Sequence, residues 1–207
     1  SFGFDTACKT YSELVGNIQR DCNSARKYWH FIKVMGRSAS HIALECALQC
    51  QPNICLVSEE VEAKQMSLDD VVTYIAKAVA QRAADGNNFG TVIVPEGLIE
   101  FIPAIKKLIA QLNEVLTDPA TGEPREFESA EAQIEFVLSN ITAENKTVLE
   151  SLPADVKRQL CLDRDPHGNV QVSLIETEKL LSAMVAKKLG EWKKEGNYNG
   201  KFCAQHH

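Results

Sequence analysis

The stretch WHFIKVMGR, residues 29–37, decides the fold class of this chain. Residues 29–35 are mostly aromatic, β-branched or aliphatic, which is typical of a buried strand, and Gly36 interrupts the run. Two further short apolar runs, at residues 54–57 and 91–94, have the same character. The segments around these three runs carry apolar residues at steps of three and four, the period of an amphipathic helix. These predicted helices span residues 5–23, 39–50, 68–83 and 102–116.

Strands that alternate with helices indicate βαβ units, and such units form a parallel sheet that helices cover on both faces. The sequence therefore predicts an α/β fold with a Rossmann-like parallel sheet flanked by helices. Ligands of such sheets usually bind beyond the carboxyl ends of the strands. We therefore expect a functional site in the loops that follow the predicted strands.

The composition changes at residues 117–124, where turn-forming residues dominate. We expect an α/β domain over residues 1–117 and a helical insertion over residues 118–168, packed on that domain. Residues 169–207 should return to the first domain as a short strand at Val170–Val172 and a helix from Glu176 to Lys194.

Charge and composition exclude several classes of protein. The 207 residues carry a formal net charge of -6, which argues against a general nucleic-acid binder. No apolar run approaches the ~18 residues that span a bilayer, so we expect no membrane segment. The seven cysteines are an odd number in a long chain without a secretory signal pattern. They favour reduced thiols in a cytoplasmic protein.

Two polar residues follow predicted strands and are candidates for ligand binding. Arg37 comes just after a strand and a glycine, where a guanidinium can bind a phosphate with two hydrogen bonds. Glu96 lies between Pro95 and Gly97 at another strand end, where a carboxylate can accept hydrogen bonds from sugar hydroxyls. The alternatives are a surface ion pair for Arg37 and a helix N-terminal acid for Glu96. Their shared place at strand ends favours a phosphorylated, polyhydroxylated small molecule.

Other candidates are explained better by packing or capping. Cys46 and Cys50 share a helix face and could serve a metal, but the apolar stripe of that helix accounts for both. Asp69 and Asp70 are more typical of a helix start than of an acid–base pair. The adjacent acids Glu59 and Glu60 are more typical of a solvated loop than of such a pair. We predict no catalytic and no metal-binding residues from these patterns.

Three segments in order resemble the phosphofructokinase family: SFGFDTA at 1–7, KYWHFIKVMGRSASH at 27–41 and PEGLIEFIP at 95–103. Residues 197–202, NYNGKF, are similar to a further family segment. The chain looks most like the long, pyrophosphate-dependent branch of the family. Ser40 supports this branch, because short bacterial members have a glycine there.

The resemblance implies roles for individual residues. Met35, Gly36 and Arg37 would bind fructose 6-phosphate, and Glu96 would contact its sugar. Lys27 and Tyr28 would reach into the site of a neighbouring subunit, which implies a homo-oligomer.

The family reaction implied is phosphoryl transfer from pyrophosphate to the C1 hydroxyl of fructose 6-phosphate, with Mg²⁺ as cofactor. The donor- and magnesium-binding loop and the Thr-Ile-Asp segment with the catalytic base do not occur in this sequence. We therefore expect the sugar-phosphate half of an enzyme, inactive alone. The alternatives are an ATP-dependent member of the family and a non-catalytic regulatory subunit.

Overall fold

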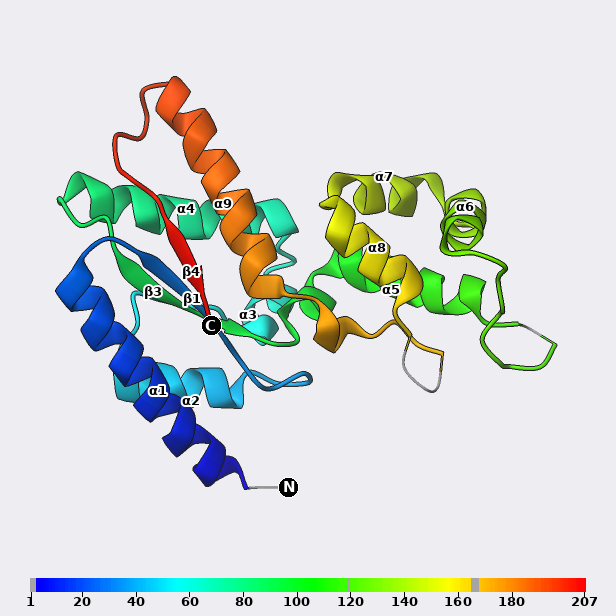
Figure 1. The fold of residues 1–207 in the computed structure, drawn as a ribbon, viewed down its shortest axis with the longest axis horizontal. Helices are drawn as coiled ribbons and strands as arrows, with labels where there is room; N and C mark the ends of the chain where they lie inside the picture. The colour runs from blue at the N-terminus through cyan, green and yellow to red at the C-terminus, as the bar shows by residue number, and fades with distance from the viewer. Residues whose placement is uncertain (1–2, 119, 165–167) are drawn as a thin grey trace. The chain divides into compact units, whose positions relative to one another are not determined.

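The computed structural model describes residues 3–118, 120–164 and 168–207. Ser1 and Phe2, which open the first family-like segment, and parts of the expected insertion lie outside the described residues. The elements in chain order (Figure 1) are α1 Phe4–Ala25, β1 Trp29–Val34, α2 His41–Cys50, β2 Ile54–Cys55, α3 Ser58–Ala63, α4 Leu68–Ala84, β3 Gly90–Pro95, η1 Leu98–Phe101, α5 Pro103–Leu116, α6 Ala130–Asn140, α7 Ala143–Ser151, α8 Ala154–Leu162, η2 Val172–Leu174, α9 Thr177–Lys194 and β4 Ala204–His206.

The described strands form one parallel sheet in the order β2-β3-β1-β4. β1 and β3 pair along their full length, from Trp29 opposite Gly90 to Val34 opposite Pro95. This arrangement confirms the predicted α/β fold and two of its strands, while β2 is shorter than residues 54–57 suggested. The register also places the ends of β1 and β3 side by side.

Helices cover both faces of the sheet. α1 and α2 pack together on one face, and α4 and α9 pack together on the other (Figure 1). On the α1–α2 face, apolar side chains of the two helices pack against those strand residues whose side chains point to the same face. The buried members of this core are Val15, Ile32, Val34, Ala43, Cys46 and Ile93.

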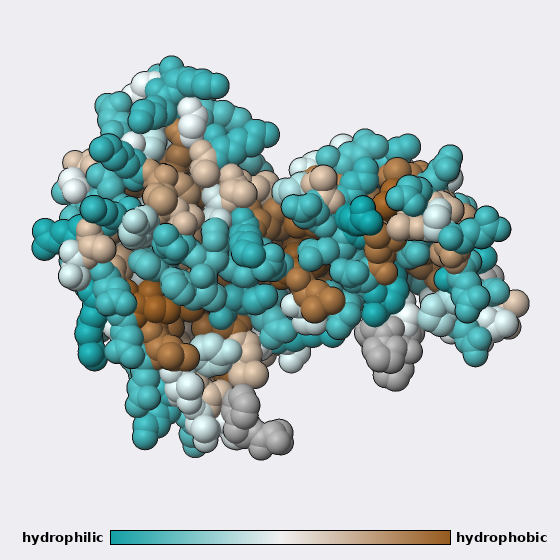
Figure 2. All heavy atoms as spheres, viewed as in Figure 1, coloured by the Kyte–Doolittle hydropathy of each residue, from teal (hydrophilic) through white to brown (hydrophobic). Residues whose placement is uncertain are grey.

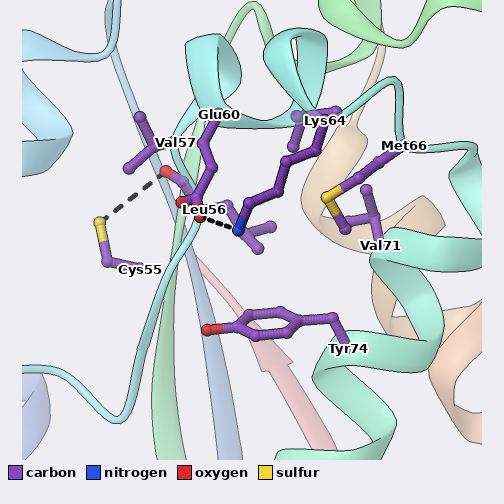
Figure 3. Close-up of a pocket in the computed structure, with 9 residues that line it drawn as sticks. Cys55, Leu56, Val57, Glu60, Lys64, Met66, Val71 and Tyr74 are labelled. Carbon is purple, nitrogen blue, oxygen red and sulfur yellow. Dashed lines mark hydrogen bonds and ion pairs between the residues drawn. The ribbon is translucent and has the colours of Figure 1, made fainter.

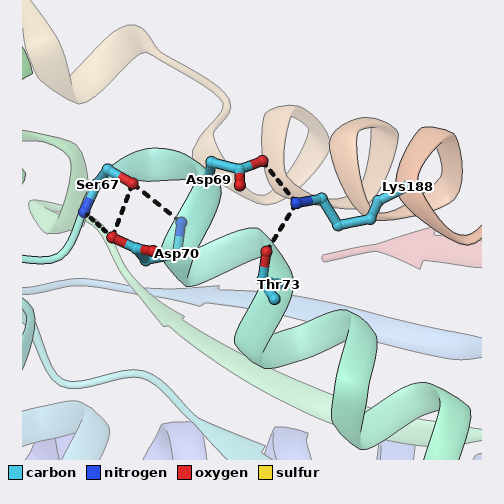
Figure 4. Close-up of polar contacts among 5 residues, drawn as sticks. All are labelled: Ser67, Asp69, Asp70, Thr73 and Lys188. Atoms are coloured by element: carbon cyan, nitrogen blue, oxygen red, sulfur yellow. Dashed lines mark hydrogen bonds and ion pairs between the residues drawn. The ribbon is translucent and has the colours of Figure 1, made fainter.

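The start of α4 is fixed by its own sequence. The Ser67 hydroxyl accepts from the Asp70 amide, and the Asp70 carboxylate accepts from the Ser67 amide, which together make a capping box. In the first two turns of α4, Asp69 Oδ1 and Thr73 Oγ1 both accept from the Lys188 ammonium of α9, at 2.6 Å and 2.7 Å (Figure 4). These contacts confirm that the acidic pair belongs to a helix start and show how α9 is tied to α4.

The chain divides into two compact units, residues 1–98 with 177–207, and residues 99–176. The second unit is helical, and in it α5 packs against α6, α7 and α8. From the sequence, the insertion was expected to start at residue 118, after α5. The boundary lies earlier in the structure because the apolar stripe of α5, including Leu108 and Leu112, is buried among the helices of its own unit.

Two local predictions differ from the structure, and one strand was not predicted. The strand expected at Val170–Val172 is wrong: Val170 makes one isolated bridge to Arg164, and a 3₁₀ turn starts at Val172. The strand that does return to the sheet is β4, at Ala204–His206. Glu59 and Glu60, expected in a solvated loop, lie in the short helix α3.

Hydrophilic side chains cover most of the face of the molecule that Figure 2 shows. Among the large hydrophobic residues that remain exposed, four lie on α1 and α2: Phe4, Leu14, Leu44 and Leu48. Within the described ranges, every helix is too short or too polar to span a lipid bilayer.

Candidate functional site

The loops after β1 and β3 meet at the carboxyl edge of the sheet. Neighbouring strands lie ~4.8 Å apart, and Val34 and Pro95 are register partners, so the residues that follow them are close in space. The Glu96 amide donates to the Val34 carbonyl at 2.9 Å, which extends the pairing by one residue. The structure thus brings residues 35–37 and Glu96 together, as the sequence analysis expected.

Two glycines make this approach possible. Gly36 has φ of +128°, a conformation that favours glycine, and a Cβ there would lie 2.7 Å from the Ala39 carbonyl oxygen. A Cβ on Gly97 would lie 1.9 Å from the Arg37 carbonyl oxygen. The backbones of the two loops are therefore in direct contact, with no room for a side chain between them.

Glu96 is half-buried at this contact. Its Oε2 accepts from the Gly36 amide at 3.4 Å. Its other carboxylate oxygen has no hydrogen-bond partner in the described part of the chain. That oxygen keeps its acceptor capacity for a hydroxyl of a ligand.

The first loop is anchored at its base and exposed at its end. The Met35 amide donates to Tyr11 Oη of α1 at 3.3 Å, and the Met35 side chain is 37% exposed. Arg37, two residues further on, is exposed. The structure therefore holds the start of the loop by its backbone, and Arg37 at its end is an exposed residue.

Lys27 and Tyr28 lie at the opposite edge of the same sheet. They precede β1, whereas Met35 and Arg37 follow it, and six strand residues span about 20 Å. The Tyr28 carbonyl accepts from the Gly90 amide at 3.2 Å, which fixes it at the amino edge. The structure does not bring these two residues to the loops of their own chain.

Sequence reasoning missed a polar cluster at the carboxyl edge. The Ser40 amide donates to Glu59 Oε1 at 2.9 Å, and the Ser40 hydroxyl accepts from the Ser58 amide at 2.9 Å. Partial burial opposes ionisation of Glu59, but its hydrogen bonds with Ser40 prevail and hold its pKa below the usual value. Adjacent acids at 59 and 60 gave no sequence signal for this contact, because it depends on where α2 and α3 meet.

The cysteine pair of α2 serves packing. Cys46 is fully buried in the core, and Cys50 Sγ donates to the Ser12 carbonyl of α1 at 3.2 Å. Burial raises the pKa of both thiols, which keeps them protonated near neutral pH. Across residues 3–118, 120–164 and 168–207, no group of three or more His, Cys, Asp or Glu side chains is placed to hold a metal ion.

A cavity of about 220 Å³ lies elsewhere in the first unit, between α3, α4 and the end of β2 (Figure 3). Tyr74 and Lys64 stand on opposite sides of it, and Lys64 forms an ion pair with Glu60 at its rim. Cys55 also lines the cavity, and burial raises the pKa of its thiol to about 11. With aliphatic walls and its lysine already paired, this cavity is poorly suited to a sugar phosphate.

The carboxyl edge offers the chemistry that a sugar phosphate requires. An exposed guanidinium can bind a dianionic phosphate through two parallel hydrogen bonds. A half-buried carboxylate on the loop after the neighbouring strand can accept from hydroxyl groups of the same ligand. Sequence reasoning found both side chains from their place after strands, but the backbone contact between their loops is visible only in the structure.

Comparison with known proteins agrees with this geometry. Residues 1–130 match the family model described as Phosphofructokinase. The chain is 63% identical over 209 residues to "Pyrophosphate--fructose 6-phosphate 1-phosphotransferase" of Porphyromonas gingivalis, covering 100% of this chain and 37% of that protein. It is 55% identical to the protein of the same name from Treponema pallidum, over 100% of this chain and 36% of the relative. A plant relative, subunit beta from Solanum tuberosum, is 48% identical over 100% of this chain and 35% of its own length.

The chain therefore spans about a third of the length of these relatives. The match covers the loops after β1 and β3 and runs from residue 1 to Ala130, where α6 begins. It confirms the resemblance found from the three sequence segments. This chain belongs to the phosphofructokinase family.

Proposed function

We propose that this chain forms the fructose 6-phosphate-binding part of a pyrophosphate-dependent 6-phosphofructokinase. The observation that carries the proposal is the contact between the Arg37 loop and the Glu96 loop at the carboxyl edge of the sheet. The names of the relatives favour pyrophosphate over ATP as the donor, because each names pyrophosphate. The full-length protein would transfer a phosphoryl group to the C1 hydroxyl of the sugar.

In this proposal Arg37 binds the 6-phosphate, and Glu96 accepts hydrogen bonds from sugar hydroxyls through its unengaged oxygen. Gly36 and Gly97 let the two loops approach, so that both side chains reach one hexose. The sugar is thereby oriented before the donor arrives, and such positioning is a large part of catalysis of phosphoryl transfer.

Lys27 and Tyr28 would serve the site of a second subunit. Their place at the amino edge, about 20 Å from their own Arg37 loop, supports this role. The working protein would then be a homo-oligomer in which the amino edge of one sheet meets the carboxyl edge of another.

The described residues do not fit the Mg²⁺ that the family reaction implies, because they include no cluster of ligands for it. We propose that the metal, the donor site and the catalytic base belong to the rest of the protein. The 207-residue chain alone would then bind the sugar phosphate without turning it over. A cytoplasmic location fits its reduced cysteines.

The test is Arg37→Ala in the full-length protein. Loss of a charge-assisted contact worth about 1.5–3 kcal/mol should raise KM for fructose 6-phosphate roughly 10- to 100-fold and leave KM for pyrophosphate unchanged. Arg20→Ala is the matched control, since Arg20 is an exposed arginine of α1 away from both loops. Equal shifts of the two KM values in Arg37→Ala would contradict the proposal.

A further inference from the structure

Lys33 is a charged residue in a central strand of the sheet. β1 has β3 on one side and β4 on the other, and its neighbours Phe31 and Val34 are fully buried. The Lys33 ammonium lies 3.6 Å from Glu178 Oε2, in the first turn of α9. The exposed fractions of the two side chains are 26% and 8%, so this ion pair is largely shielded from water.

Glu178 depends on this contact. Its Oε2 atom is closed to solvent and has no hydrogen-bond partner among the described residues. Burying a carboxylate is costly unless an opposite charge compensates it. Lys33 supplies that charge, and the positive end of the α9 dipole adds to it. The ammonium is therefore held at one place beside α9.

The pair lies just before the candidate binding loop. Lys33 is two residues before Met35, or ~7 Å along the strand. Between them, the Val34 carbonyl accepts from the Glu96 amide at 2.9 Å. The end of β1 is thus held from two directions, by the β3 loop through its backbone and by α9 through the Lys33 side chain.

Stability alone does not require a buried ion pair at this place. Apolar residues of similar volume often replace such pairs without loss, whereas removing one partner leaves an uncompensated charge. A geometric role accounts better for a charged lysine in a strand whose other residues, apart from His30, are apolar. We propose that Lys33 and Glu178 are positioning residues that fix the end of β1, so that the Met35–Arg37 loop meets the sugar phosphate. This inference rests on the proposed function, and neither residue touches the ligand.

The experiment uses the full-length protein and two single variants, Lys33→Met and Glu178→Gln. Each should raise KM for fructose 6-phosphate on the order of 10-fold, because small displacements of binding groups are costly. KM for pyrophosphate should stay unchanged. Lys33→Arg keeps the ion pair and should stay within about 2-fold of the parent protein, since a guanidinium also pairs with a carboxylate. Glu178→Gln keeps the shape of the side chain and covers the case in which Lys33→Met fails to fold.

The matched control is Lys188→Met, which breaks another ion pair of the same helix (Figure 4). Lys188 bridges α9 to Asp69 and Thr73 of α4, about 15 Å along the helix from Glu178. This variant should lower thermal stability and leave KM for fructose 6-phosphate unchanged. If Lys33 had only a structural role, Lys33→Met would likewise lower thermal stability and leave KM for fructose 6-phosphate unchanged.

The outcomes separate this inference from the proposed function. If Arg37→Ala raises KM for fructose 6-phosphate and Lys33→Met and Glu178→Gln do not, the positioning role is overturned and the proposed function stands. If Arg37→Ala leaves that KM unchanged, the proposed function itself fails. Equal increases of both KM values in Glu178→Gln would also overturn the positioning role.

Discussion

The two edges of the parallel sheet both depend on a glycine in a confined place, but they use it differently. At the carboxyl edge, Gly97 lets one loop backbone touch another, and polar side chains stand beside the contact. At the amino edge, a Cβ on Gly90 would lie 2.5 Å from the Trp29 ring and 2.8 Å from Asn53 Oδ1. A confined glycine therefore does not mark a binding site by itself, because the groups around it decide whether space is left for a ligand.

The amino edge is closed by side-chain packing. Trp29 is fully buried, and the Arg82 guanidinium lies 5.9 Å from its ring and 5.3 Å from the ring of Phe89. Asn53 Oδ1 accepts from the Thr91 amide at 2.9 Å. These side chains fill the space at the amino edge by packing on one another, although Trp29 Nε1 is buried without a hydrogen-bond partner among the described residues. Glu96 at the other edge is half-buried and keeps an unengaged carboxylate oxygen.

The largest expected effect is at the carboxyl edge, for Gly97→Ala. The new Cβ would lie 1.9 Å from a backbone oxygen of Arg37, so one of the two loops must move. We expect a destabilisation of about 3 kcal/mol, the upper range for overpacking, and loss of measurable saturation by fructose 6-phosphate. Urea unfolding and steady-state kinetics of the full-length protein measure both. A variant with a normal KM for the sugar phosphate would show that the loops need not touch.

Gly90→Ala tests the other edge. Its Cβ would meet the Trp29 ring and the Asn53 side chain, which can shift more easily than backbone, so we expect a loss of about 1–3 kcal/mol. The folded variant should raise KM for fructose 6-phosphate less than Gly97→Ala does, because it leaves the Arg37 and Glu96 loops intact and acts on a neighbouring site only through Tyr28, whose carbonyl accepts from the Gly90 amide. If that KM rises as much as in Gly97→Ala, the two edges are not functionally distinct.

The framework of the sheet could be predicted from sequence. β1 and β3 are apolar runs bounded by turn formers, and parallel pairing necessarily brings their ends to one edge. For that reason Arg37 and Glu96 were expected together, and the structure brings their loops into contact. Their roles, like those of Met35 and Gly36, remain predictions until binding is measured.

The missed features depend on tertiary context. β4, with the sequence AQH, is too short and polar to show strand periodicity, and it forms because the edge of β1 offers free backbone groups. The segment VQV at 170–172 has strand composition but belongs to the helical unit, whose described residues contribute no strand to the sheet. The pairing of Lys33 with Glu178 joins residues far apart in sequence, so no local pattern could reveal it.

Acid should weaken the amino edge. His30 Nδ1 and His207 Nε2 lie 3.0 Å apart, between β1 and the chain beyond β4. Burial lowers the pKa of both imidazoles, and the neighbouring His207 lowers that of His30 further. The unfolded chain therefore binds protons more readily, so stability is full above the unfolded pKa of ~6.5 and falls as pH drops below it.

His30→Gln removes one of these titrations and keeps a polar side chain beside His207. Between about pH 6.5 and 5, the free energy of unfolding should then depend less steeply on pH. The decrease in slope should correspond to the uptake of up to roughly one proton fewer on unfolding. Urea unfolding across this range measures the slope, and Gln205→Asn, on the neighbouring strand, is a control without a titrating group. An unchanged slope would mean that His30 does not titrate differently in the folded chain.

The smallest effect is expected at Gly16, which lies in the middle of α1, away from both edges. A Cβ there would meet nothing within 4 Å, and the residue is helical, so neither backbone conformation nor packing requires glycine. Gly16→Ala should raise the free energy of unfolding by about 0.5–1 kcal/mol, because alanine loses less backbone entropy in a helix. Urea unfolding measures the gain, and KM for fructose 6-phosphate should not change. A destabilised Gly16→Ala would place a partner surface against α1 in the full-length protein, since only a neighbour absent from this chain could then oppose the added methyl group.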